Sequence, residues 1–179
     1  MRKLLALLLM LTVGYAEAKL TLEDYQMSVR NILEFEEGFR SSPYLCSEGY
    51  VTIGYGTKLH NSKGMNPHDF SLVISKEAGY ALLKDKVAEL LHKLQFGANS
   101  DAFRKAPEAT KQILLSMAYQ LGYAGLLGFK VMWYHLKHGD YVAAATAALD
   151  SRWAMQTPAR ANRHAHVIAT GNMGVYDEH

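Results

Sequence analysis

Residues 37–56 read EGFRSSPYLCSEGYVTIGYG, and the pattern of apolar residues changes within this stretch. The residues before it have helical spacing, whereas residues 50–55 alternate and are rich in β-branched and aromatic side chains, which is typical of a strand. Ser47-Glu48-Gly49 has turn composition, and Gly54 and Gly56 mark a turn at the far end. The stretch therefore predicts that a helix is followed by a small antiparallel hairpin or meander.

The residues before this stretch predict a helix that begins after Thr21, a suitable N-cap, and stops at Gly38. Glu36 and Glu37 fall in its last turn, where the helix dipole disfavours an anion and so favours the protonated carboxyl. Spacings of three and four residues give one apolar stripe along the helix, made by Leu22, Tyr25, Val29, Ile32 and Phe35.

The residues after the stretch predict helices. Ser75 caps the longest helical pattern, which ends at about Phe96. Its apolar face is formed by Ala78, Leu82, Leu83, Val87, Leu90, Leu91 and Leu94. Further helices are predicted over residues 107–120, 129–138, 140–149 and 157–170. We therefore predict an α+β fold in which a small helix-plus-hairpin lobe is joined by a long helix to an all-helical lobe.

The N-terminus has the order of a secretory signal. Arg2 and Lys3 precede an apolar run at residues 4–13, and Ala16-Glu17-Ala18 offers a cleavage site. The run is shorter than the roughly 20 residues that a spanning helix needs. We predict that residues 1–18 are a cleaved signal, or alternatively a signal-arrest-release segment that tethers the chain transiently to the inner membrane. Residues 19–179 then form one domain, exported to the periplasm or outside the cell.

The composition points away from several other classes of protein. The 179 residues carry a formal net charge of +2. The chain lacks the basic runs interleaved with aromatic residues that a nucleic-acid binder uses, so no nucleic-acid partner is expected. Eight histidines include no HExxH pattern, and we expect no metal and no cofactor. The single cysteine excludes an internal disulfide. We expect the protein to be a monomer.

A carboxyl, a thiol and a hydroxyl recur at fixed spacing in the opening stretch. Eight residues separate Glu37 from Cys46, and five separate Cys46 from Thr52. Because the chain turns back through the hairpin, the three side chains can face one another. Cys46 alone is more often a small buried side chain, and Thr52 alone is a routine strand residue.

This spacing resembles the signature of the phage-type lysozymes of glycoside hydrolase family 24, in which Glu, eight residues, Asp or Cys, five residues and Thr follow one another. The flanking segments EGFR and EGxxTIGYG resemble the family as well. The likeness continues through most of the chain, at Gln120-x-Gly122, Gly128-Phe129, Ser151-Arg152-Trp153 and residues 156–161 (QTPARA).

The resemblance implies a two-lobed, lysozyme-like fold with a cleft, and hydrolysis of the β-1,4 bond between N-acetylmuramic acid and N-acetylglucosamine in peptidoglycan. It implies Glu37 as general acid, Cys46 in place of an aspartate, Thr52 as a holder of the attacking water, and Arg160 as the ionic partner of Glu37. Residues implied to line the sugar sites are Glu48, Gln120, Arg152 and Trp153. It also implies an endolysin that lyses a host cell, with peptidoglycan glycan strands as its partner.

Glycosidic cleavage needs a proton on the leaving oxygen and a nucleophile at the anomeric carbon. Helix-end placement and an apolar wall at Phe39 and Tyr55 favour a protonated Glu37, whereas a nearby Arg160 favours the charged form. A thiol is mostly uncharged near neutral pH. Cys46 is therefore either an activated thiolate nucleophile, with retention, or a holder of water beside Thr52, with inversion, and we favour inversion.

Three alternatives remain open from the sequence. Cys46 and a histidine such as His60 are the residue types of a cysteine peptidase or amidase. The missing carboxylate suits a wall-binding module without activity. If no water reaches the anomeric carbon, the product is that of a lytic transglycosylase. Trp153 is either a core residue or a sugar platform.

Overall fold

The computed structural model describes residues 22–46 and 49–176, with the side chains of the first helix from Val29 onward. The predicted signal or signal-arrest segment at residues 1–18 and the predicted sugar-site residue Glu48 therefore lie outside the described residues.

The described elements form a small sheet followed by a series of helices. They are α1 (Leu22–Glu37), β1 (Arg40–Leu45), β2 (Tyr50–Gly54), β3 (Thr57–Lys63), the 3₁₀ helix η1 (Pro67–Asp69), α2 (Lys76–Phe96), α3 (Ser100–Lys105), α4 (Glu108–Leu127), α5 (Lys130–Lys137), α6 (Tyr141–Leu149), α7 (Arg152–Gln156), α8 (Pro158–Thr170) and the 3₁₀ helix η2 (Gly174–Tyr176). The predicted α+β fold is confirmed.

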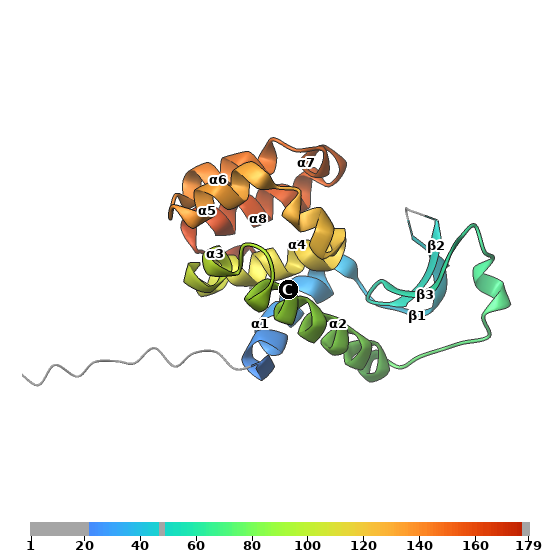
Figure 1. Ribbon diagram of the computed structural model, residues 1–179. Coiled ribbons are helices and arrows are strands. Elements are labelled where there is room, and N and C mark those ends of the chain that lie inside the picture. Colours follow the sequence, from blue (N-terminus) through green and yellow to red (C-terminus); the bar gives the residue numbers. More distant parts are fainter. Residues whose placement is uncertain (1–21, 47–48, 177–179) are drawn as a thin grey trace, which may run out of the picture.

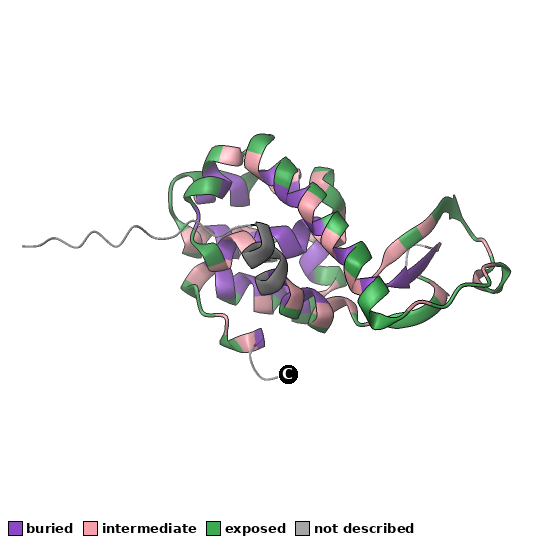
Figure 2. Cartoon of the chain, turned by 90° about the horizontal axis from the view of Figure 1, so that it is seen from below, coloured by how far each residue is buried: buried purple, intermediate pink, exposed green. Residues whose placement is uncertain are grey.

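The sheet and most of the helices form two separate lobes (Figure 1). Helices α3 to α8 gather into one mass, and the three strands stand apart from it, while α1 and α2 run toward the strands from the helical side. Buried residues concentrate in the helical mass and in part of the sheet (Figure 2). Within the described residues, no helix is both long and apolar enough to cross a membrane.

Helix α1 ends where the sequence predicts. Gly38 follows it with a φ of 64°, a left-handed conformation that glycine adopts without cost, and its N–H donates to the carbonyl of Glu34. Val29 and Ile32 of the predicted stripe are fully buried, whereas Phe35 is 37% exposed. The stop at Gly38 leaves Glu37 as the last helical residue and turns the chain into β1.

The three strands form an antiparallel meander in the order β1-β2-β3. Tyr44 lies opposite Thr52 in the β1–β2 pair, and Thr52 lies opposite Lys58 in the β2–β3 pair. Strand β2 is therefore central, and its residues 51–54 are all buried. The predicted hairpin or meander is thus a three-stranded meander that extends to Lys63.

Helix α2 is capped as predicted and packs closely on the sheet lobe. The Ser75 hydroxyl accepts from the N–H of Ala78, and Gly97 ends the helix. A Cβ added at Gly79 would lie 2.6 Å from a ring carbon of Phe39, so glycine is needed for the close approach. The predicted apolar face is wrong at Ala78 and Leu82, which are exposed, because in these turns Gly79 and Leu83 are the residues that face the packed side of α2.

The main core lies in the helical lobe, with Tyr55 as its contribution from the sheet lobe among the described residues. Two helices there escape the sequence prediction, α3 and α7, since each spans less than two turns. Helix α4 continues to Leu127, but Gly122 interrupts it with φ 75° and ψ 158°. The helix predicted over residues 107–120 therefore does not end there but is kinked at Gly122 and continues after it.

Candidate active site

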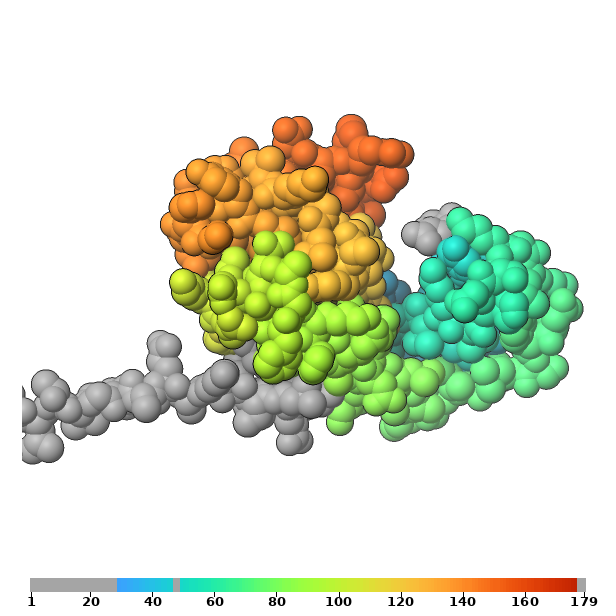
Figure 3. Space-filling model, in the orientation of Figure 1, coloured from blue at the N-terminus to red at the C-terminus, as the bar shows by residue number. Residues whose placement is uncertain are grey.

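Glu37 is the last residue of α1, and its carboxylate lies against both lobes, at Arg160 of α8 and at Gly56 of the β2–β3 turn. Figure 3 shows a hollow between the sheet lobe and the helical lobe. The Glu37 side chain is 19% exposed, so it is largely withdrawn from solvent but still accessible. This is the placement that a proton donor to a bound polymer requires.

Three elements surround the Glu37 carboxylate. Arg160 of α8 donates from Nη1 to Oε1 over 2.7 Å, the ion pair that the family resemblance implies. The β2–β3 turn approaches from the sheet lobe, where a Cβ added at Gly56 would lie 3.7 Å from Oε2. Tyr119 of α4 donates to the carbonyl of Tyr55 over 2.7 Å, and burial and the Glu37 charge raise its pKa. The carboxylate thus has a cation on one side and a phenol nearby.

Arg160 is itself buried, with a side chain only 7% exposed. Its Nη2 donates to the carbonyl and the hydroxyl of Ser116 in α4, over 3.2 Å and 3.0 Å. Its Nε makes no hydrogen bond and lies 4.0 Å from Oε2 of Glu36. One guanidinium therefore faces two adjacent glutamates.

Glu36 forms a second ion pair behind the first one. Arg163 binds it through two hydrogen bonds, of 2.9 Å from Nε and 2.8 Å from Nη2, and Tyr176 donates to it over 2.9 Å. The Glu36 side chain is only 4% exposed. Sequence analysis missed this pair, although two neighbouring glutamates and two arginines three residues apart on one helix were a usable pattern.

His164 completes this buried polar cluster. Its side chain is fully buried, its Nε2 lies 3.1 Å from the Ser116 hydroxyl, and its Nδ1 lies 2.7 Å from the Tyr176 hydroxyl. Burial, reinforced by Arg160 and Arg163, lowers the pKa of His164 well below its usual value near 6.5. A histidine in this environment is neutral in the folded protein.

The depressed pKa of His164 predicts a loss of stability in acid. Below about pH 6.5 the unfolded chain binds a proton at His164 and the folded chain does not, so the free energy of unfolding falls as the pH falls. The slope approaches about 1.4 kcal/mol per pH unit for one group. Urea unfolding at pH 7.0, 6.0 and 5.0 measures it. The variant H164V should flatten this dependence relative to the matched exposed-histidine variant H166V, and equal slopes in both would contradict the prediction.

Cys46 and Thr52 share one face of the β1–β2 hairpin. The N–H of Cys46 donates to the carbonyl of Tyr50 over 2.9 Å, and Thr52 lies opposite Tyr44, so the two residues are diagonal neighbours across the strands. Cys46 is partly exposed, whereas Thr52 is 2% exposed and donates to the carbonyl of Tyr44 over 3.3 Å. The Thr52 oxygen keeps a lone pair with which to accept from a water.

The implied sugar-site residues of the helical lobe divide into two kinds. The Trp153 indole donates to Oε1 of Gln120 over 2.8 Å, and its side chain packs among Phe129 and His164. At 5% exposure Trp153 is largely a core residue that orients Gln120, but it also borders a hollow of the helical lobe, so its role as a sugar platform stays a prediction. Arg152 is exposed and borders a hollow of about 510 Å³.

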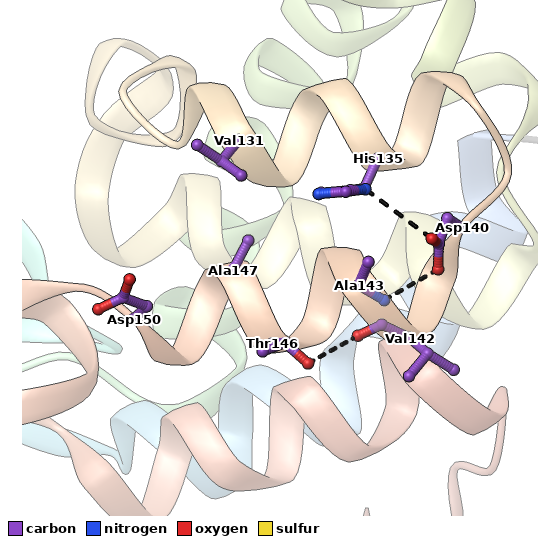
Figure 4. A pocket seen from close by; sticks show the side chains of 8 residues that line it. All are labelled: Val131, His135, Asp140, Val142, Ala143, Thr146, Ala147 and Asp150. Atoms are coloured by element: carbon purple, nitrogen blue, oxygen red, sulfur yellow. Dashed lines mark hydrogen bonds and ion pairs between the residues drawn. The ribbon is translucent and has the colours of Figure 1, made fainter.

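A further hollow of about 530 Å³ lies between α5 and α6 (Figure 4). His135 and Asp140 lie side by side in its lining, 3.9 Å apart, and none of the predicted site residues borders it. Across residues 22–46 and 49–176, no three His, Cys, Asp or Glu side chains are grouped so that they would hold a metal ion. His60, the histidine of the peptidase alternative, is exposed and accepts from the N–H of Ser62.

A largely buried glutamate in the hollow between a small sheet and a helical lobe, paired with an arginine, defines a lysozyme-type glycoside hydrolase. The sequence pattern of the phage lysozyme family matches residues 34–165. The chain belongs to this family and is a lysozyme, a glycosidase that hydrolyses peptidoglycan.

Individual relatives agree with this assignment. The chain is 28% identical over 166 residues to the pre-baseplate central spike protein Gp5 of Enterobacteria phage T4, an alignment that covers 84% of this chain but 29% of the spike protein. It is 25% identical over 166 residues to the probable T4-type lysozymes 1 and 2 of Dictyostelium discoideum, which covers 83% of this chain and 98% of each relative.

Proposed function

We propose that this chain hydrolyses the β-1,4 bond between N-acetylmuramic acid and N-acetylglucosamine, with Glu37 as the general acid. The observation that supports this most directly is the place of Glu37 between the lobes, 19% exposed and tied to Arg160 at 2.7 Å. Its proton goes to the glycosidic oxygen as the bond to the anomeric carbon breaks. The proposal is tested by replacing Glu37, as argued in the Discussion.

Cys46 and Thr52 hold the attacking water in this proposal. They lie on the same face of the hairpin, and the Thr52 oxygen and the Cys46 sulfur can both take part in hydrogen bonds with a water. The water adds to the anomeric carbon on the face opposite to the leaving group, and the configuration inverts. Gln120 and the exposed Arg152 bind sugar or its substituents from the helical side.

The variant C46S distinguishes water positioning from covalent catalysis. Since a serine hydroxyl also binds water, we expect C46S to keep its turnover of purified peptidoglycan within about tenfold of wild type. For the wild-type enzyme and for C46S alike, the new reducing end should appear first as the α-anomer in proton NMR. The matched control S41A changes an exposed residue of β1, the strand that Cys46 follows, and should leave turnover unchanged. If C46S instead loses about 10³-fold in turnover, and the first product of the wild-type enzyme is the β-anomer, Cys46 is the nucleophile.

The mass of the products separates the remaining alternatives. A hydrolase yields a new reducing muramic acid end, whereas a lytic transglycosylase yields an anhydro end that is lighter by one water. An amidase or peptidase yields new free amines instead. A chain that binds peptidoglycan but releases no fragment would support the inactive wall-binding module.

We further propose that the lysozyme acts as an endolysin after export and lyses a host cell from the periplasm. The apolar run at residues 4–13, preceded by Arg2 and Lys3, supports export. Expression of the full chain in a bacterial host, followed by mass spectrometry of the mature N-terminus, tests it. A mature chain beginning after Ala18 indicates a cleaved signal, and an intact N-terminus found first in the membrane and then free indicates arrest and release.

A further inference from the structure

Arg160 stands between two glutamates that are neighbours in sequence. Its Nη1 lies 2.7 Å from Glu37, and its Nε, which makes no hydrogen bond, lies 4.0 Å from Oε2 of Glu36. A guanidinium is a planar fork that readily engages a carboxylate through two of its nitrogens. The unpaired Nε is therefore a donor that a small movement would bring onto Glu36.

Hydrogen bonds to both oxygens of Glu36 hold its carboxylate in place, with Oε2 4.0 Å from the Arg160 Nε. Arg163 donates to both of them, and Tyr176 donates to Oε1 over 2.9 Å. Arg163 holds Glu36 from the exposed side of α8, with its own side chain 27% exposed, whereas Tyr176 is 5% exposed. Tyr176 is thus the buried partner of Glu36.

The hydrogen bonds around His164 fix the orientation of the Tyr176 hydroxyl. Arg160 can only donate, so the Ser116 oxygen accepts from it and its hydroxyl is left to donate to Nε2 of His164. An ionised Glu36 can only accept, so Tyr176 donates to it and accepts from Nδ1–H of His164. A single neutral tautomer of His164, with its proton on Nδ1, is consistent with the hydrogen bonds of Ser116, His164 and Tyr176.

We propose that Tyr176, oriented by His164, is a positioning residue for the catalytic acid: by holding the Glu36 carboxylate through Oε1 it keeps Oε2 away from Arg160 and leaves Arg160 to Glu37. This inference rests on the proposed role of Glu37. It assigns a function in catalysis to a residue of the C-terminal 3₁₀ helix that touches neither the sheet lobe nor Glu37 through any of its described hydrogen bonds.

The proposal predicts the sign of a change in pH dependence. The charged or titratable groups that face Glu37 are Arg160 from α8, Tyr119 from α4 and its own neighbour Glu36, while the β2–β3 turn presents Gly56. If Glu36 loses the Tyr176 hydroxyl, it draws the Arg160 guanidinium away from Glu37. A carboxyl that loses a cation stays protonated to higher pH, so the acid remains active to higher pH.

The test compares Y176F with the control Y134F, which removes the hydroxyl of an exposed tyrosine on α5. We measure kcat and KM on soluble peptidoglycan fragments from pH 4 to pH 9. In Y176F the alkaline limb of the kcat/KM profile should move to higher pH by about half a unit or more, with KM little changed. Y134F should match wild type. A Y176F limb that coincides with wild type, or that moves downward, overturns the proposal.

A second readout does not depend on catalysis. Titration of the Glu37 carboxyl carbon by ¹³C NMR should show an upward displacement of its midpoint in Y176F and a downward one in E36Q, because E36Q removes the competing charge. If E37Q stays active, the proposed acid is wrong, yet the NMR still tests whether Tyr176 controls the Arg160 pairing. If E37Q is inactive and the Glu37 midpoint is unmoved in Y176F, only the positioning inference fails.

Discussion

The variant E37Q is expected to lose at least about 10³-fold in turnover of purified peptidoglycan. General acid catalysis contributes about 10²–10⁴-fold, and an amide has no proton of suitable acidity for the leaving oxygen. The amide oxygen can accept a hydrogen bond from Arg160 Nη1 as the Glu37 carboxylate does, so the variant should still fold. Turnover is measured as the release of soluble reducing ends. A circular dichroism spectrum of the same preparation checks that the variant is folded.

A matched control separates loss of the acid from loss of any glutamate. E108Q changes an exposed residue at the start of α4, with a side chain 46% exposed, and should keep wild-type turnover. A folded E37Q with activity near that of E108Q would remove Glu37 from the mechanism and leave the hollow without its proton donor. Residual activity of E37Q that rises steeply in acid would instead indicate that solvent supplies the proton.

The variant R160M should lower the free energy of unfolding by about 3–5 kcal/mol, the largest change in stability expected here. Removing one partner of a buried ion pair leaves the other charge without compensation. R160M leaves Glu37 without its cation and removes the donor to the Ser116 carbonyl and hydroxyl. The midpoint of urea unfolding at pH 7, with an unchanged slope, measures the loss.

The nearby R152M removes the same charge from an exposed position and should change stability by no more than about 0.5 kcal/mol. Equal midpoints for R160M and R152M would contradict the view that the Arg160 pair joins α8 to the end of α1. R152M should instead weaken the binding of peptidoglycan fragments, since Arg152 borders a hollow of the helical lobe.

Long elements with capping residues could be predicted from the sequence, whereas short helices and contacts between distant residues could not. Ser75 and Gly97 bound α2 in the sequence and in the structure, because capping is a contact between near neighbours. Helix α7 escaped prediction although Ser151 caps it, since five residues are too few to show a helical period. The burial of Trp153 was undecidable because it depends on Phe129 and His164, which approach it only in the folded chain.

The sequence alone determined the fold class, the order of the elements and the spacing of Glu37, Cys46 and Thr52, since periodicity and turn residues are properties of short segments. The resemblance already implied the pair of Arg160 and Glu37, but only the tertiary structure decided that Arg163 and Tyr176 hold Glu36. Glu36 and Glu37 are adjacent in the chain, and a helix turns successive residues by about 100°, so the two point in different directions. Which partners they meet is set by how α8 and η2 pack on α1, more than 100 residues away in the sequence.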